Sequence, residues 1–139
     1  MPDMRMEMSK KSKYYIDKHR KYELLHFCKQ YQKWKEALRD VQGWSIPAPL
    51  DTEKVNEGYR RGDPVARAAA IISFYKDRIG LIEKAAYDAD PELCEYIIKG
   101  VTEDKSYDNL YLVHDIPCSR DTYYDRRAKF FWILDKLRG

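Results

Sequence analysis

Residues 106–127 read SYDNLYLVHDIPCSRDTYYDRR, and this stretch gives the clearest indication of the fold. Ser106 and Ser119 each precede a helical pattern, where a serine side chain can accept hydrogen bonds from free N–H groups of the first turn. Pro117 prevents the first helix from running on. The pattern predicts a short helix, a tight turn and a longer helix, that is, a helix-turn-helix. The glycine common in such a turn is absent, and we expect Asp115 or a neighbour to take its place.

The start of the second helix is the part of this motif that can enter a DNA major groove. The groove-facing candidates are Ser119, Arg120, Asp121, Tyr124 and Arg127. Arg120 could make a paired hydrogen bond to guanine, and Asp121 could accept one from cytosine. Ser119 or Tyr124 could hold a phosphate. Two further cations on this helix would add charge toward the DNA backbone: Arg126 and Lys129.

The charge distribution favours a DNA-facing second helix, and it predicts a smaller electrostatic contribution to DNA binding than a strongly basic domain would have. The whole chain carries a net charge of only +3. Residues 88–118 hold two Lys against eight Asp and Glu, whereas residues 119–139 hold six Lys and Arg against three Asp. In the alternative interpretation the helix pair only forms core, Asp121 and Asp125 complement the positive helix N-terminus, and the arginines are ordinary solvated groups.

The remaining sequence predicts further helices and no strands, so the fold class is all-α. Apolar residues recur at three- and four-residue steps from Tyr14 to Val41, which predicts one long N-terminal helix. Asp63-Pro64 and Asp90-Pro91 each pair an N-cap with a proline at the first helical position, and the second of these helices should end near Gly100. Between them, the prolines after Gly43 predict a connecting loop over 42–62.

The length of 139 residues fits one domain. We expect a flexible tail at 1–13 and a single helical domain at 14–139, of which 90–138 is the helix-turn-helix portion. The aromatic residues of the final helix are expected to serve as core or as dimer contacts. A homodimer through that helix would suit a symmetric DNA site.

Other functional classes find little support in the sequence. The three cysteines form no CxxC pair and no secretion signal or membrane span is present, which suggests the cytoplasm. Cys28 and Cys94 are expected to be core residues. Pro117 disrupts the four-residue spacing of His114 and Cys118, so we expect no metal site. We also expect neither an enzyme nor a cofactor, because the histidines lack a nucleophile partner and no glycine loop could cradle a phosphate.

Three blocks of the chain resemble small proteins of phages and prophages of Gram-positive bacteria. The blocks are YYIDKHRKYELLHFC at 14–28, YIIKGVT at 96–102, and IPCSRDTYY at 116–124 with KFFWILDKL at 129–137. The C-terminal part, about 90–138, is similar to phage transcriptional regulators of the RinA/ArpU type, whose ending resembles DNA-binding region 4 of sigma factors. Two features depart from the pattern of these regulators: the first helix of the helix pair has an acidic flank, and the N-terminal hundred residues have no counterpart in a sigma-like module.

The resemblance implies a sequence-specific DNA-binding regulator of phage genes that acts in the cytoplasm of a bacterial host cell. Double-stranded DNA is then the expected partner, read by the start of the last helix. The alternative is a protein-interaction module that binds a host factor such as RNA polymerase, with the acidic segment from Asp88 to Asp108 engaging a basic surface.

Overall fold

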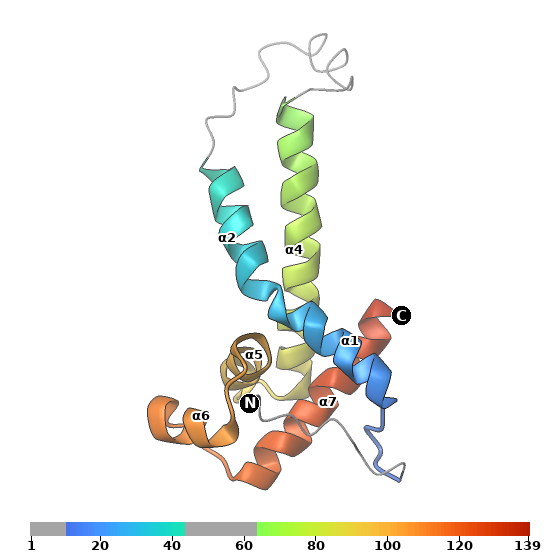
Figure 1. Ribbon diagram of the computed structural model, residues 1–139, viewed down its shortest axis with the longest axis vertical. Coiled ribbons are helices and arrows are strands. Elements are labelled where there is room, and N and C mark those ends of the chain that lie inside the picture. Colours follow the sequence, from blue (N-terminus) through green and yellow to red (C-terminus); the bar gives the residue numbers. More distant parts are fainter. Residues whose placement is uncertain (1–10, 44–63) are drawn as a thin grey trace. The chain divides into compact units, whose positions relative to one another are not determined.

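The computed structural model describes residues 11–43 and 64–139, and every regular element within them is an α-helix (Figure 1). The prediction of an all-α fold is confirmed. The helices are α1 (Lys18–Lys29), α2 (Tyr31–Gln42), α4 (Pro64–Ala89), α5 (Cys94–Glu103), α6 (Tyr107–His114) and α7 (Arg120–Arg138). The tail expected at 1–13 and the loop expected at 42–62 fall almost entirely outside the described residues.

The chain divides into two compact units. Unit 1 comprises Met1–Gln32 and Gly80–Gly139, and unit 2 comprises Lys33–Ile79. Helices α2 and α4 each contribute to both units. The single helical domain expected over 14–139 stays a prediction.

Unit 1 holds the larger core. Helix α1 packs against α5 and α7, and α5 packs against α6 and α7. Large side chains of this unit with almost no exposed surface are Leu24, Leu25, Ile82, Ile97, Leu110, Tyr123, Phe130, Phe131 and Leu134. Each such side chain stabilises the fold by roughly 1.5–3 kcal/mol relative to an exposed position. This core fixes the positions of α6 and α7, which carry the predicted site.

The prediction of one long helix over 14–41 is wrong at two points. Regular helix begins at Lys18, because the Asp17 carboxylate accepts a hydrogen bond from the His19 N–H at 3.0 Å and caps the first turn. The helix is then interrupted at Gln30, and α2 starts at Tyr31. No proline or glycine marks this interruption, and the apolar spacing continues across it, so the sequence pattern gave no sign of a break.

One predicted helix start is confirmed, the second is displaced by three residues, and one predicted helix end is wrong. Helix α4 begins at Pro64, as expected, and the cap predicted at Asp63 lies outside the described residues. The Asp90 carboxylate accepts hydrogen bonds from the N–H groups of Glu92 (2.9 Å) and Leu93 (3.2 Å), but a turn precedes regular helix, which starts only at Cys94. Helix α5 also continues past Gly100 to Glu103.

Candidate nucleic-acid interface

The turn between α6 and α7 is built around Asp115. This residue adopts a left-handed conformation (φ 53°, ψ 45°), as the sequence predicted for the position usually taken by glycine. The N–H of Ile116 then donates to the Leu110 carbonyl at 3.2 Å, and the Ile116 side chain is buried. The turn is therefore anchored in the core of unit 1.

We expect Asp115→Gly to raise the free energy of unfolding by about 0.5 kcal/mol, because glycine adopts the left-handed conformation without a Cβ penalty. The matched variant Asp115→Ala should lower it by roughly 1 kcal/mol. Urea unfolding of the full chain measures both changes. A loss of stability in Asp115→Gly would show that the carboxylate, rather than the backbone conformation, is what this position requires.

Hydrogen bonds from side chains fix the start of each helix in the pair. Ser106 Oγ accepts from the Asn109 N–H at 3.2 Å, and Ser119 Oγ accepts from the Thr122 N–H at 3.3 Å. Both predicted serine caps are thus confirmed. The Tyr107 hydroxyl donates to the Cys118 carbonyl at 2.5 Å, which ties the first turn of α6 to the residue before the α7 cap. Residues 118 and 119, which lead into α7, are therefore fixed by a hydrogen bond to α6 and by a hydrogen bond within the first turn of α7.

The first turn of α7 faces outward. Ser119, Arg120 and Asp121 are exposed, as predicted for residues that contact a ligand. The Arg120 guanidinium forms an ion pair with the Asp108 carboxylate of α6, and its central carbon lies 5.3 Å from the centre of the Tyr107 ring. Arg120 is therefore accessible, but it is held toward α6 by a contact that a ligand would have to replace.

The expectation that Tyr124 and Arg127 face a groove is wrong. Their exposed fractions are 7% and 3%, and the central carbon of the Arg127 guanidinium lies 4.9 Å from the centre of the Tyr124 ring. Both residues belong to the buried face of α7, which also carries Tyr123 and Phe130. The four-residue step from Tyr123 to Arg127 was the signal, available in the sequence, that places Arg127 on the core face.

The two remaining predicted cations are only partly available. Arg126 reaches Asp90 (Nε to Oδ2, 3.2 Å) and Asp125 (Nη1 to Oδ2, 2.7 Å), so its charge is largely balanced within unit 1. Lys129 is half-buried. Of the predicted site, the structure exposes Ser119, Arg120 and Asp121 together at the start of α7. Arg126 and Lys129 lie further along this helix and are only partly exposed.

The burial of Lys21 close to Arg127 was not predicted from the sequence. Lys21 of α1 is only 3% exposed, and its Nζ lies 5.6 Å from the centre of the Phe131 ring. Burial and, to a smaller extent, the nearby Arg127 charge lower the pKa of Lys21 to about 8. Lys21 lies three residues before Leu24 and seven before Cys28, on the spacing of the apolar face, and this was the signal for its burial.

The end of α6 exposes large apolar side chains. Tyr111, Leu112 and Val113 are 57%, 77% and 64% exposed. Tyr111 stacks on Tyr107 with 6.0 Å between ring centres. Since these three residues are consecutive, they point in different directions around the helix rather than forming one face.

Within the described residues, no three His, Cys, Asp or Glu side chains gather closely enough to hold a metal ion. Cys28 is fully buried, as expected of a core residue, and burial raises the pKa of its thiol. The helices of residues 11–43 and 64–139 include none that is long and apolar enough to cross a membrane.

No family model, no curated protein and no solved structure matches this chain. The structure defines an all-α protein. Its C-terminal part consists of α6, a turn in which Asp115 has a left-handed backbone conformation, and α7, whose first residues are exposed.

Proposed function

We propose that this protein binds double-stranded DNA with the first turn of α7 in the major groove, and that it acts as a regulator of phage genes in the cytoplasm of a bacterial host. The observation that carries the proposal is the exposed surface of residues 119–121 at the start of α7, which is fixed by the Ser119 cap while one face of the later turns is buried in unit 1. A rigid helix start on a packed scaffold is the arrangement by which helix-turn-helix proteins reach base edges.

Each exposed residue has a distinct proposed role. Arg120 reads guanine through paired hydrogen bonds, and Asp121 accepts from cytosine. Ser119 and the free N–H groups of the helix start hold a phosphate, which the helix dipole favours. Arg126 and Lys129 contribute charge toward the DNA backbone at the side of the helix. Tyr124 and Arg127, being buried, support this turn and make no contact with DNA.

DNA binding requires Arg120 to exchange Asp108 for a base. The pair is exposed on both sides, and exposed ion pairs contribute only about 0–1 kcal/mol. A paired hydrogen bond to guanine discriminates against the wrong base by about 1–3 kcal/mol. The exchange is therefore favourable, and Asp108 serves to orient Arg120 in the absence of DNA.

Arg120→Ala should reduce discrimination between a preferred duplex and random duplexes by about 1–3 kcal/mol. The preferred duplex is first selected by the full chain from a random pool, and both affinities are then measured by fluorescence polarisation at several salt concentrations. Lys84→Ala is the matched control, since Lys84 is an exposed cation of α4 that pairs with Asp88 four residues away on the same helix. Equal loss of affinity for preferred and random DNA in Arg120→Ala would contradict base reading.

A second function, binding of a host protein such as RNA polymerase, is favoured by one observation. Tyr111, Leu112 and Val113 expose an unusual amount of apolar surface at the end of a short helix. The aromatic and aliphatic side chains could enter an apolar pocket of a partner. If the chain binds purified RNA polymerase, loses that binding in Leu112→Ser, and retains no DNA at low salt, this function replaces the first.

A further inference from the structure

We propose that the outer part of α4, over residues 67–78 in unit 2, is a self-association surface that pairs with the same surface of a second copy of this chain in antiparallel orientation. The proposal does not depend on DNA binding. It replaces the homodimer expected through α7, because Phe130, Phe131 and Leu134 of that helix are buried within unit 1.

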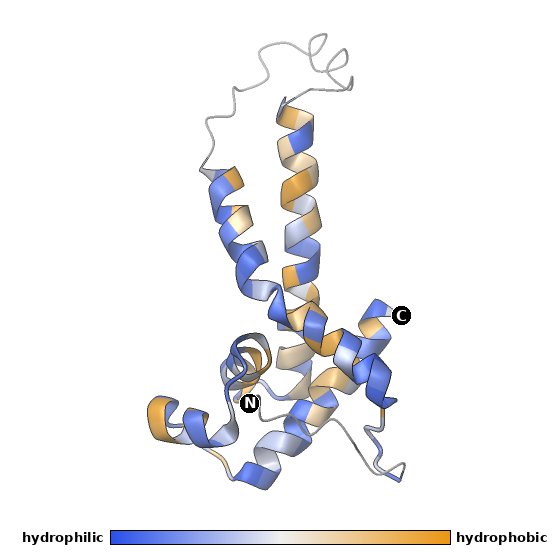
Figure 2. Ribbon diagram, viewed as in Figure 1, coloured by the Kyte–Doolittle hydropathy of each residue, from blue (hydrophilic) through white to orange (hydrophobic). Residues whose placement is uncertain are grey.

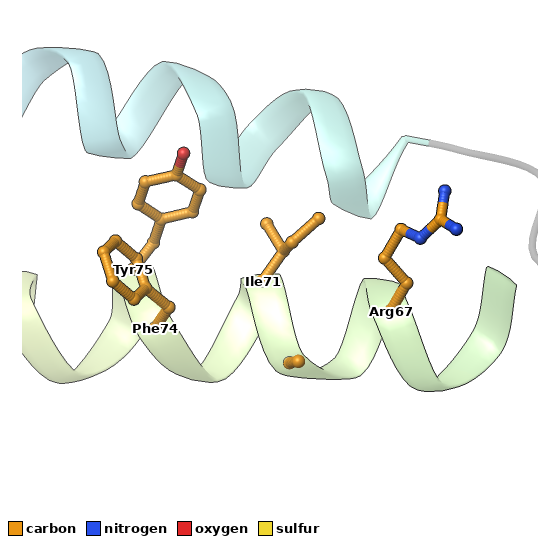
Figure 3. Close-up of a pocket in the computed structure, with 5 residues that line it drawn as sticks. Arg67, Ile71, Phe74 and Tyr75 are labelled. Atoms are coloured by element: carbon orange, nitrogen blue, oxygen red, sulfur yellow. The ribbon is translucent and has the colours of Figure 1, made fainter. Parts of the chain in front are cut away.

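The surface contains a depression shaped for a side chain from another helix. It has a volume of about 290 Å³ and is lined by Arg67, Ala70, Ile71, Phe74 and Tyr75 (Figure 3). The first four lining residues have the spacing i, i+3, i+4 and i+7. Four residues at this spacing form the hole that receives one knob when two helices pack side by side. The geometry therefore points to a helix as occupant.

No residue of α2 lines this depression, because every lining residue belongs to α4. Figure 3 shows α2 alongside α4, with the Arg67, Ile71 and Tyr75 side chains pointing toward it, so α2 borders the depression on one side. The buried α4 residues of unit 2, Ala68 and Ile79, lie about 100° around the helix from the centre of the depression. Figure 2 shows hydrophobic residues around much of the outer part of α4. Such a helix needs to be covered on more than one face.

A second copy fits the depression in size and in charge. Phe74 is 47% exposed, and Ala70 beside it is exposed and small. In an antiparallel pair with Phe74 of one copy opposite Ala70 of the other, the same register sets Asp77 opposite Arg67. Both charged residues are exposed, and neither forms an ion pair within the part of the chain that the structure describes. The two-fold symmetry makes each of these contacts twice.

Contacts with Arg78 fix the Phe74 ring, which is the side chain proposed to enter the depression of the second copy. The Arg78 guanidinium lies 3.4 Å from the centre of the Phe74 ring, and its Nη1 donates to the Phe74 carbonyl at 3.1 Å. These contacts hold the ring in one orientation before association, which lowers the entropy lost on binding. Because the contact area of one helix face is small, we expect weak, concentration-dependent association.

Sedimentation velocity of the full chain, from about 5 to about 500 µM, measures this association. We expect a monomer–dimer equilibrium, and Phe74→Glu should raise its dissociation constant at least roughly tenfold. Lys76→Glu is the matched control, because Lys76 is exposed on nearly the opposite side of α4 and should change the constant less than about twofold. A monomer at every concentration, or a dimer unaffected by Phe74→Glu, would overturn the proposal.

A reciprocal charge exchange tests the register with exposed residues only. Arg67→Asp and Asp77→Arg should each weaken the dimer, since each places like charges opposite one another. The double variant should restore the dissociation constant to within about threefold of the original. Failure of the double variant to restore association, while circular dichroism shows it folded, would overturn the antiparallel pairing.

Discussion

Gly100→Ala is expected to lower the free energy of unfolding by about 2–3 kcal/mol, although alanine is ordinarily preferred to glycine inside a helix. A Cβ built on Gly100 would lie 2.1 Å from the Tyr123 hydroxyl oxygen and 3.3 Å from its Cζ. Tyr123 has no exposed surface and packs edge-on against Tyr124, so the ring has little room to move away. Overpacking of this kind costs about 1–3 kcal/mol or more, which outweighs the helical gain of about 0.5–1 kcal/mol.

Two variants isolate this clash from the effect of glycine on the helix itself. Gly80 lies inside α4, and a Cβ there meets no atom within 4 Å, so Gly80→Ala should be stabilising by about 0.5–1 kcal/mol. Adding Tyr123→Phe to Gly100→Ala removes the oxygen at 2.1 Å and should recover more than about half of the loss. Denaturant unfolding of the variants gives the values. If Gly100→Ala proved as stable as Gly80→Ala, the packing of α5 on α7 would differ from that described.

Lys21→Met is expected to lose about 2 kcal/mol of stability relative to the original chain when the pH rises from about 7 to about 10. Burial and the Arg127 charge lower the pKa of Lys21 to about 8, whereas an ordinary lysine in the unfolded chain has a pKa of 10.5. Folding therefore favours the neutral amine over the protonated one by an amount on the order of 3 kcal/mol. Methionine fills a similar volume and does not titrate, so the variant lacks this pH dependence.

The sign of this change follows from the direction of the pKa change. Below about pH 8 the amine is protonated in both states, and the preference of the folded state for the neutral amine lowers stability in full. Between the two pKa values the folded state releases its proton first, so this penalty falls as the pH rises. The original chain should therefore gain about 2 kcal/mol of stability relative to Lys21→Met between about pH 7 and about pH 10.

Unfolding by urea at about pH 7 and about pH 10 measures this difference, because other groups titrate equally in both proteins. Lys84→Met, at an exposed position of α4, is the control and should change stability by less than about 0.5 kcal/mol at either pH. An equal stability difference between Lys21→Met and the original chain at the two pH values would contradict the lowered pKa of Lys21.

Local sequence signals predicted the helix pair well because each signal acts within one turn of the chain. Ser106 and Ser119 accept hydrogen bonds from N–H groups three residues away. The turn depends on the left-handed backbone conformation of a single residue, Asp115. These interactions do not depend on the rest of the fold. The same holds for Pro64 at the start of α4.

Features that arise from tertiary packing were not predicted. The interruption at Gln30 carries no local signal. Gly100, expected near a helix end, instead lies inside α5, where the absence of a side chain admits the Tyr123 ring. Arg127 was assigned to the ligand because of its charge, although its spacing from Tyr123 and Phe130 placed it on the buried face. At such positions packing against another helix decides exposure, and residue type alone does not.

Photo-cross-linking from the first turn of α7 tests the DNA-binding account most directly. Benzoylphenylalanine is placed at Asp121, or at the exposed Tyr87 of α4 as control, and each full-length variant is irradiated with the duplex selected by the original chain. We expect a covalent link to DNA bases from position 121 and none from position 87. Retained DNA binding without a cross-link from position 121, or failure of the original chain to select any duplex at low salt, would contradict the account.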